Sequence, residues 1–128
     1  ILATGSAQLN GEVRVTLIAP ELIGAGEFSR VLFAGQQGVI DNGLTLIAPS
    51  TVVARYELDY TSGRSAKLAY KVDFGPQWLG DNVRSVGDYF NRVQNAGSSA
   101  ALADEVLTLL FEEDEADYKN FLSSLLPD

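Results

Sequence analysis

The sequence contains no cysteine, no methionine and no histidine. Without cysteine there is no disulfide framework, no thiol nucleophile and no thiolate metal ligand. Such a chain fits a reducing compartment, or a protein that crosses an oxidising one without cross-links. Without histidine the chain lacks the commonest general base and transition-metal ligand. We therefore predict a protein that is not an enzyme, with no catalytic residue, no cofactor and no metal site.

Long apolar runs are also absent, because the longest are about four or five residues and a bilayer span needs roughly 20. We expect no membrane insertion of this piece. The chain starts at Ile1, without a basic region or a long apolar region of a signal peptide, which predicts a cut from a longer protein. Its 128 residues, 46% of them hydrophobic, suit one compact domain or two very small ones.

Basic charge is scarce in the second part of the chain. The net charge is −8; residues 1–80 hold seven acids and six bases, whereas residues 81–128 hold ten acids and three bases. An acidic half repels phosphate backbones and anionic lipids, so nucleic acid and membrane surfaces are not expected as partners.

The first part of the chain has the alternation of β-strands. Residues 8–19 predict a half-buried strand, and residues 27–34 predict a second one anchored by Phe28, Val31 and Phe33. Asp41-Asn42-Gly43 is typical of a tight turn, followed by a short strand at 44–48. No internal repeat at a fixed period is found.

Residues 52–60 and 66–74 alternate most clearly and predict an antiparallel hairpin. One face is apolar and aromatic, and the other carries charges. The inward set is Val52, Ala54, Tyr56, Leu58 and Tyr60 on the first strand and Ala66, Leu68, Tyr70, Val72 and Phe74 on the second.

The apolar spacing changes from two to three or four within residues 75–97. Asp81 or Asn82 is expected to cap a helix that runs to about Gln94 and ends at Gly97. Ser98 or Ser99 is expected to cap a second helix. A third begins at Asp114 and is stopped by Pro127.

Trp78, the only tryptophan, lies in this hinge. We predict that it plugs the end of the sheet and seats the first helix, together with Phe90; the other interpretation is an aromatic residue of a binding surface. The acidic run 112–117 is interpreted as a helix start, since it lacks the spacing of a calcium loop. The glycines at 24, 26, 35 and 38 are interpreted as turn residues and not as a nucleotide-binding loop.

The hinge and helices resemble a known family. A hairpin ending in KVDF is followed by a helix of the form N-x-x-x-V-G-x-Y-x-x-x-V-x-x-A-G, a leucine-rich helix and a Tyr-x-x-x-Leu-x-x-Leu-x-Pro close. This order resembles the segment of bacterial autotransporters (type V secretion) between the secreted β-helical passenger and the outer-membrane β-barrel. The matching positions are Asn82, Val86, Gly87, Ala96, Gly97, Leu102, Leu109, Leu110, Tyr118, Leu122, Leu125 and Pro127.

The resemblance implies an autochaperone-like region that folds first and seeds the remaining coils of the passenger. It also implies partners, the upstream passenger and the downstream barrel, and a location at the outer membrane and cell surface of a Gram-negative bacterium after periplasmic transit. Such proteins are secreted and often serve virulence. The barrel itself is not in the sequence, and the first helix, with Arg84, Asp88 and Arg92, is more polar than the family's.

We therefore expect an α+β fold: a β-sheet or β-helix end, sandwich-like, over residues 1–80, and a three-helix junction over residues 81–128. The structural junction residues are Trp78, Asn82, Val86, Gly87, Phe90 and Gly97. The expected function is a non-enzymatic junction that caps the passenger and supports its folding and secretion. The alternative is a surface adhesion module that binds a protein or glycan. A junction should leave an open strand edge near residues 8–17, where edge-to-edge self-association is expected, whereas an adhesin should expose an aromatic patch.

Overall fold

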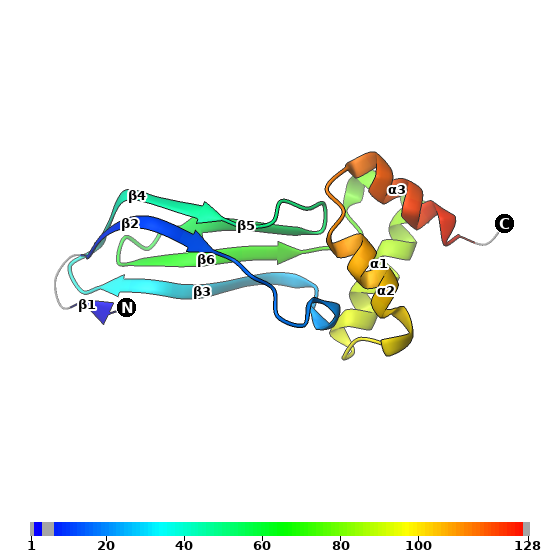
Figure 1. Cartoon of the computed structure of the whole chain (residues 1–128), viewed down its shortest axis with the longest axis horizontal. Coiled ribbons are helices and arrows are strands. Elements are labelled where there is room, and N and C mark those ends of the chain that lie inside the picture. Colours follow the sequence, from blue (N-terminus) through cyan, green and yellow to red (C-terminus); the bar gives the residue numbers. More distant parts are fainter. Residues whose placement is uncertain (1, 4–6, 127–128) are drawn as a thin grey trace. The chain divides into compact units, whose positions relative to one another are not determined.

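The computed structural model describes residues 2–3 and 7–126 and has an α+β fold, with strands first and helices after them (Figure 1). The chain forms two compact units. Unit 1 consists of residues 1–16, 27–48 and 56–70, and unit 2 of residues 17–26, 49–55 and 71–128. Two segments from the strand-rich part of the sequence, 17–26 and 49–55, thus belong to the unit that holds the helices.

Unit 1 contains two pairs of parallel strands with one sequence offset. Strand β1 (Leu2–Ala3) pairs with β3 (Gly26–Gly35), and β2 (Ala7–Arg14) pairs with β4 (Val39–Ile47). In both pairs the partner at first lies 32 positions later, from Leu2 to Ala34 and from Ala7 to Val39, and a register shift in β4 makes the offset 33 from Gly11 and Leu44 onward. Two successive strands that pair in parallel with the next two, in separate sheets, form one turn of a solenoid stacked on another.

The amino-acid sequence thus shows no repeat, as predicted, but the backbone does repeat, because successive strands pair in parallel with later ones. Gln8 pairs with Ile40 and Leu9 with Asp41, so that partner residues differ in polarity. The repeat is carried by backbone hydrogen bonds, which are indifferent to side chains.

The predicted tight turn at Asp41-Asn42-Gly43 is wrong, because these residues lie inside β4. The pairing of β4 with β2 shifts by one residue there, between Leu9 and Gly11. The Asp41 carboxylate accepts hydrogen bonds from the backbone N–H groups of Gly43 (3.0 Å) and Leu44 (2.9 Å), and Gly43 has a φ of 106°. These residues form the hydrogen bonds and the positive φ that are typical of a tight turn, but the result is a β-bulge within a strand.

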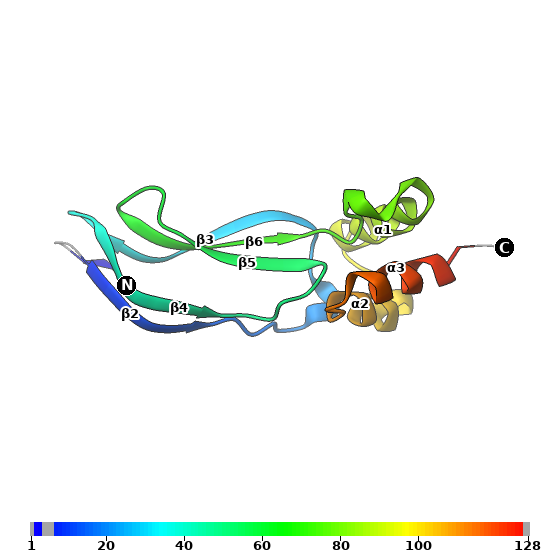
Figure 2. The same ribbon diagram turned by 90° about the horizontal axis from the view of Figure 1, so that it is seen from above.

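The predicted hairpin is confirmed as β5 (Ala54–Asp59) and β6 (Ser65–Val72). Strand β6 pairs with β3, and the sheet order is β1-β3-β6-β5. The arrows of β3 and β6 point in opposite directions in Figure 1, and Figure 2 shows β2 and β4 as a separate layer. Stacked rings of Phe28, Tyr70 and Tyr56 cross β3, β6 and β5, with centroids 5.1 and 5.9 Å apart. Phe28 and Val31 are nevertheless exposed, so the prediction that they anchor β3 is wrong.

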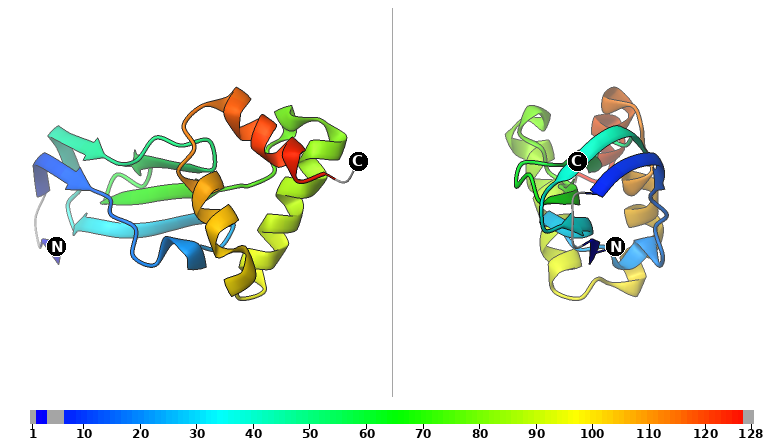
Figure 3. Two further views of the ribbon diagram at one scale, coloured as in Figure 1. Left: turned by 45° about the vertical axis from the view of Figure 1, so that its right-hand side comes forward. Right: turned by 90° about the vertical axis from the view of Figure 1, so that its left-hand side faces the viewer.

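Unit 2 holds the apolar core of the described residues. Its helices are α1 (Asp81–Asn95), α2 (Ala103–Leu110) and α3 (Glu115–Ser124), with short 3-10 helices η1 (Pro20–Leu22), η2 (Gln77–Leu79) and η3 (Ala100–Leu102). Figure 3 shows α3, in orange and red, against α1, in green and yellow. The fully buried side chains of this core include Val53, Val72, Phe74, Leu79, Val106, Leu109, Leu110, Tyr118 and Leu122.

The helix boundaries follow the sequence closely, and the caps do so in part. Asp114 caps α3 as predicted, since its carboxylate accepts a hydrogen bond from the N–H of Asp117 at 2.9 Å. The N-cap of α1 is Gly80 and not Asp81 or Asn82, and Ser99 precedes η3 without a side-chain cap. Pro127 lies outside the described residues. None of the described helices has the length and apolar character needed to cross a bilayer.

Candidate functional site

The main candidate site in unit 2 is the end of β6, where two helices hold the backbone of one residue. The N–H of Phe74 donates to the side-chain oxygen of Asn91 on α1 at 2.7 Å. The carbonyl of Phe74 accepts a hydrogen bond from the hydroxyl of Tyr118 on α3. Both backbone groups leave the sheet ladder at this point, and side chains replace the missing strand neighbour. We call the segment Asp73–Gly75 and the side chains that bind it the strand-end clamp.

Neighbouring side chains extend the clamp. The amide of Asn91 donates to the carboxylate of Asp73 at 2.9 Å, and the same oxygen accepts the N–H of Gly75 at 2.9 Å. Arg84 donates through Nε to the carbonyl of Gly75 at 3.2 Å. Asn91 thus uses both the oxygen and the N–H₂ group of its side chain within the clamp. The reversed orientation of this amide would lose these hydrogen bonds.

Gly87 brings α1 against the clamp backbone. A Cβ atom at Gly87 would overlap with the carbonyl oxygen of Phe74 and lie 2.5 Å from the Cα of Gly75. A Cβ at Gly75 would in turn lie 2.5 Å from the carboxylate of Asp88. Two glycines therefore allow a helix and a strand end to approach with backbone against backbone, which no larger residue permits.

The C-terminal end of α1 holds the segment 17–26 in the same unit. The amide nitrogen of the buried Gln94 donates to the carbonyls of Glu21 (2.9 Å) and Ile23 (2.8 Å), and the side-chain oxygen of Asn95 accepts the N–H of Ala25 at 2.8 Å. Among the described residues, the side-chain oxygen of Gln94 has no hydrogen-bond partner although it is buried. Three polar positions of one helix face, 91, 94 and 95, thus bind backbone that is distant in sequence.

The predicted junction residues differ in their positions. Phe90 is buried, and its ring lies 6.2 Å from that of Phe74; Gly87 makes the backbone contact described above. Val86 is half-buried on the same helix, and Asn82 is exposed in its first turn. Gly97 follows α1 with a φ of 106°, so a left-handed residue ends the helix as predicted.

Trp78 is not the predicted plug. Its side chain is 42% exposed, whereas the adjacent Leu79 is 1% exposed. The indole contacts Tyr118, with ring centroids 6.4 Å apart. Sequence reasoning selected the larger side chain, but the 3-10 turn η2 directs its leucine inward and its tryptophan to the surface.

Sequence reasoning misses Asn91 and Gln94, whose side chains bind backbone groups that are distant in sequence. The available signal was weak but present. Gln94 shares a helix face with Gly87 and Phe90, three and four residues apart, where an apolar residue is expected.

Burial governs the pKa of the hydroxyl group in the strand-end clamp. Burial, with a smaller contribution from the negative charge of Asp73, raises the pKa of Tyr118 far above its ordinary value. Burial also raises the pKa of Tyr56 and Tyr60. An activated catalytic hydroxyl needs the opposite shift. Among the residues from Asn10 to Leu126, no cluster of three or more acidic side chains is placed to hold a metal ion.

Unit 1 offers a second candidate site, the outer edge of β2. The sheet that contains β2 has two strands in the order β2-β4, so that one edge of β2 is unpaired in the described part of the chain. Alternation continues along it, with Val13 and Val15 half-buried and Asn10, Glu12 and Arg14 exposed. We call residues 10–16 at this edge the free edge, as predicted for residues 8–17.

The α+β fold thus presents one candidate site in each unit, the free edge of β2 in unit 1 and the strand-end clamp in unit 2. Comparison with family models, with curated proteins and with solved structures found no match to this chain.

Proposed function

We propose that this chain is the terminal region of a parallel β-solenoid of the autotransporter kind, which caps the passenger and supports its folding. The observation that carries the proposal is the common offset of 32 residues between β1 and β3 and between β2 and β4. That offset is the geometry of stacked solenoid coils, and it leaves the edge of the first coil ready for another.

The two ends of this short solenoid differ in a way that supports a cap. On one side, β6 of the hairpin covers β3, whereas β4 has β2 as its one strand neighbour in the described part of the chain. On the other side, the free edge presents backbone groups to which a further coil can add in parallel. A solenoid needs capping at its ends, and an open edge next to a stable end lets further coils add to it.

The clamp supports the role of a folding nucleus. The strand-end clamp, the Gln94 bonds and the buried core of unit 2 connect segments far apart in sequence within 17–26, 49–55 and 71–126. A unit with such a core is expected to fold early, and residues 54–55 of β5 and 71–72 of β6 belong to it. The proposed location at the outer membrane and cell surface, and the upstream passenger and downstream barrel as partners, rest on the resemblance of the helical motifs alone.

The adhesion alternative is favoured by one observation. Trp78, Tyr89 and Phe111 are all exposed on unit 2, although a junction was expected to bury its aromatic residues. They lie on η2, α1 and the end of α2. The open edge of β2, however, is a feature that an adhesin does not require. The junction is therefore the function that we propose first.

The test is to fuse this chain after a parallel β-solenoid that has lost its own C-terminal cap, and to measure the refolded yield after dilution from denaturant. We expect the wild-type chain to raise the yield several-fold. Arg14→Pro, which blocks the free edge by removing an N–H, should abolish the gain. Arg14→Thr, which keeps the N–H and suits a strand, should retain it. Equal yields for the two variants would overturn the proposal.

A glycan array and a screen of extracellular proteins test the alternative. Specific binding that is lost in a Trp78→Ala variant, in a chain that does not help solenoid refolding, would favour the adhesin.

A further inference from the structure

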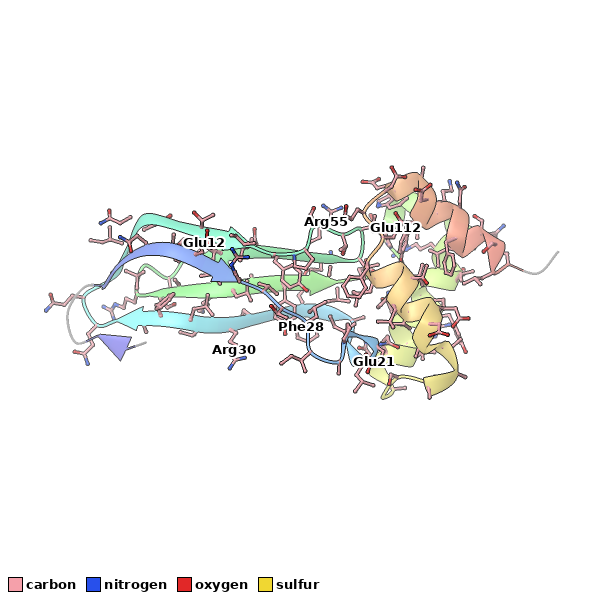
Figure 4. The ribbon with its side chains drawn as sticks, in the orientation of Figure 1. Glu12, Glu21, Phe28, Arg30, Arg55 and Glu112 are labelled. Atoms are coloured by element: carbon pink, nitrogen blue, oxygen red, sulfur yellow. The ribbon has the colours of Figure 1, made fainter. Side chains whose placement is uncertain are left out.

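The free edge of β2 has a feature that the proposed cap does not require: its charges are complementary to themselves. Glu12 and Arg14 form an ion pair at 3.1 Å along one strand, and their side chains are 53% and 69% exposed. Figure 4 shows Glu12 on this strand. No proline interrupts residues 10–16, so each residue of the edge keeps its backbone N–H group.

The backbone fixes which residues face outward. The N–H of Val15 donates to the carbonyl of Ile47 at 2.9 Å, so that the hydrogen-bonding groups of Val15 point to β4. In a strand these groups alternate in direction from one residue to the next. The groups of Val13 therefore also point to β4, and those of Glu12 and Arg14 point to the free edge.

Three of the antiparallel registers in which a second copy can pair with this edge about a twofold axis are centred on residue 12, 13 or 14. An axis at residue 12 places Glu12 opposite Glu12 of the second copy, and an axis at residue 14 places Arg14 opposite Arg14. Like charges directly opposite each other are destabilising. An axis at Val13 places Glu12 opposite Arg14 of the second copy, twice, and makes these the hydrogen-bonded pairs.

We propose that this chain forms a symmetric dimer through antiparallel pairing of β2 with β2 of a second copy, with the twofold axis at Val13. Glu12 and Arg14 of the two copies then form a square in which neighbouring charges have opposite signs. The half-buried side chains of Val13 and Val15 lie on one face of the resulting β4-β2-β2-β4 sheet. Such an isologous contact closes on itself and produces dimers and not fibres. It occupies the same edge as a further coil, so dimerisation and coil stacking exclude each other. The inference goes beyond the proposed function and does not depend on it.

Charge reversal tests the register. A short strand contact predicts a dissociation constant on the order of 0.1 mM, measurable by sedimentation equilibrium. We expect Glu12→Arg and Arg14→Glu each to weaken the dimer by about tenfold or more. The double variant, which exchanges the two charges, should restore the wild-type constant within about threefold. A chain that remains monomeric at about 1 mM, or a dimer that the single variants leave unchanged, would overturn the proposal.

Cross-linking tests the axis independently of charge. The chain has no cysteine, so a single Val13→Cys variant carries one thiol, placed on the axis in a non-hydrogen-bonded pair. Residues of such a pair have Cα atoms about 4.5 Å apart, within the range that a disulfide spans. Thr45→Cys, exposed on β4, is the matched control. Rapid disulfide formation by Val13→Cys alone is expected; equal rates for both variants would exclude the register.

The charge variants also separate this inference from the proposed function, because they leave the backbone groups of the edge intact. Variants that are monomeric but still help a fused solenoid to refold would support both statements. A dimer that gives no help in refolding would overturn the proposed function alone. A wild-type monomer that does help would overturn the dimer alone.

Discussion

The hydroxyl of Tyr118 donates a hydrogen bond to the backbone carbonyl of Phe74, 44 residues earlier in the chain. Tyr118 is 0% exposed and Phe74 is 0% exposed, so water does not replace this bond if it is lost. Phe74, two residues after the end of β6, thus depends on the third helix for its carbonyl and on the first helix for its N–H. The strand end and the helices of unit 2 are therefore expected to unfold together.

Removal of the Tyr118 hydroxyl should destabilise unit 2. Tyr118→Phe keeps the ring but leaves a buried carbonyl without its donor, which costs about 1–3 kcal/mol. The measurement is the free energy of unfolding in urea. Tyr89→Phe, at an exposed position of α1, is the control and should change the free energy by less than about 0.5 kcal/mol. Equal effects would indicate that the hydroxyl bond adds nothing.

The same residue predicts the stability of the chain in alkali. The pKa of Tyr118 is raised in the folded chain by burial, whereas in the unfolded chain it is about 10. Below pH 10 both states hold the proton. Above pH 10 only the unfolded state releases it, so stability should fall by about 1.4 kcal/mol per pH unit from this group.

Tyr118→Phe should flatten that alkaline loss. Tyr56 and Tyr60, whose pKa values are also raised, remain in both chains and cancel in the comparison. Thermal melts between pH 8 and pH 11 provide the measurement, at about half-unit steps. If the two chains lose stability in parallel, the Tyr118 hydroxyl is not protected from ionisation.

Gly87→Ala should destabilise the chain, although a glycine-to-alanine substitution within a helix usually stabilises a protein. In an ordinary helix interior alanine is more stable than glycine by about 1 kcal/mol. Here the added methyl group overlaps with the backbone of Phe74 and Gly75, and overpacking of this kind costs about 1–3 kcal/mol. Denaturant unfolding should therefore show a loss. Ser85→Ala, exposed on the same helix, should leave stability nearly unchanged, and a stabilised Gly87→Ala chain would refute the close approach.

Gln94→Glu should produce a destabilisation that acid relieves. The substitution replaces an N–H₂ group that binds two carbonyls by a buried carboxylate, at a cost of about 3 kcal/mol or more near neutral pH. Burial raises the pKa of that new carboxyl group above its unfolded value of about 4.3. Its protonated form is favoured in the folded chain, so stability relative to wild type should recover as the pH falls towards 4.

The control for this prediction is Gln94→Leu, which has a similar size and no charge. Its loss of stability should be independent of pH between about 4 and 7. A constant deficit in Gln94→Glu over that range would mean that position 94 is open to water.

The sequence predicts the local elements well because their signals are local. The hairpin from Ala54 to Val72 follows from alternation, and Asp114 and Gly97 are placed correctly because caps and left-handed residues depend on a few neighbouring atoms. The coil could not be predicted in this way. Its partners lie 32 positions apart, as Ala7 and Val39 do, and share no residue pattern.

Two errors have a common physical origin. The residue types alone predict a tight turn at Asp41-Asn42-Gly43 and a plug at the end of the sheet at Trp78. Pairing with β2 extends the strand through the tripeptide, and the direction of η2 turns the indole outward. Tertiary context decided both, as it also gave Asn91 and Gln94 their backbone partners.

The exposed indole of Trp78 against Tyr118 makes unit 2 optically distinct. The single tryptophan belongs to the unit that holds the helices, whereas Tyr56, Tyr60 and Tyr70 belong to the unit that holds the coil. Indole emission therefore reports the helical unit alone, and circular dichroism reports the whole chain. If the circular dichroism changes at a lower denaturant concentration than the indole emission, a state exists in which unit 1 has unfolded and unit 2 has kept its native fluorescence.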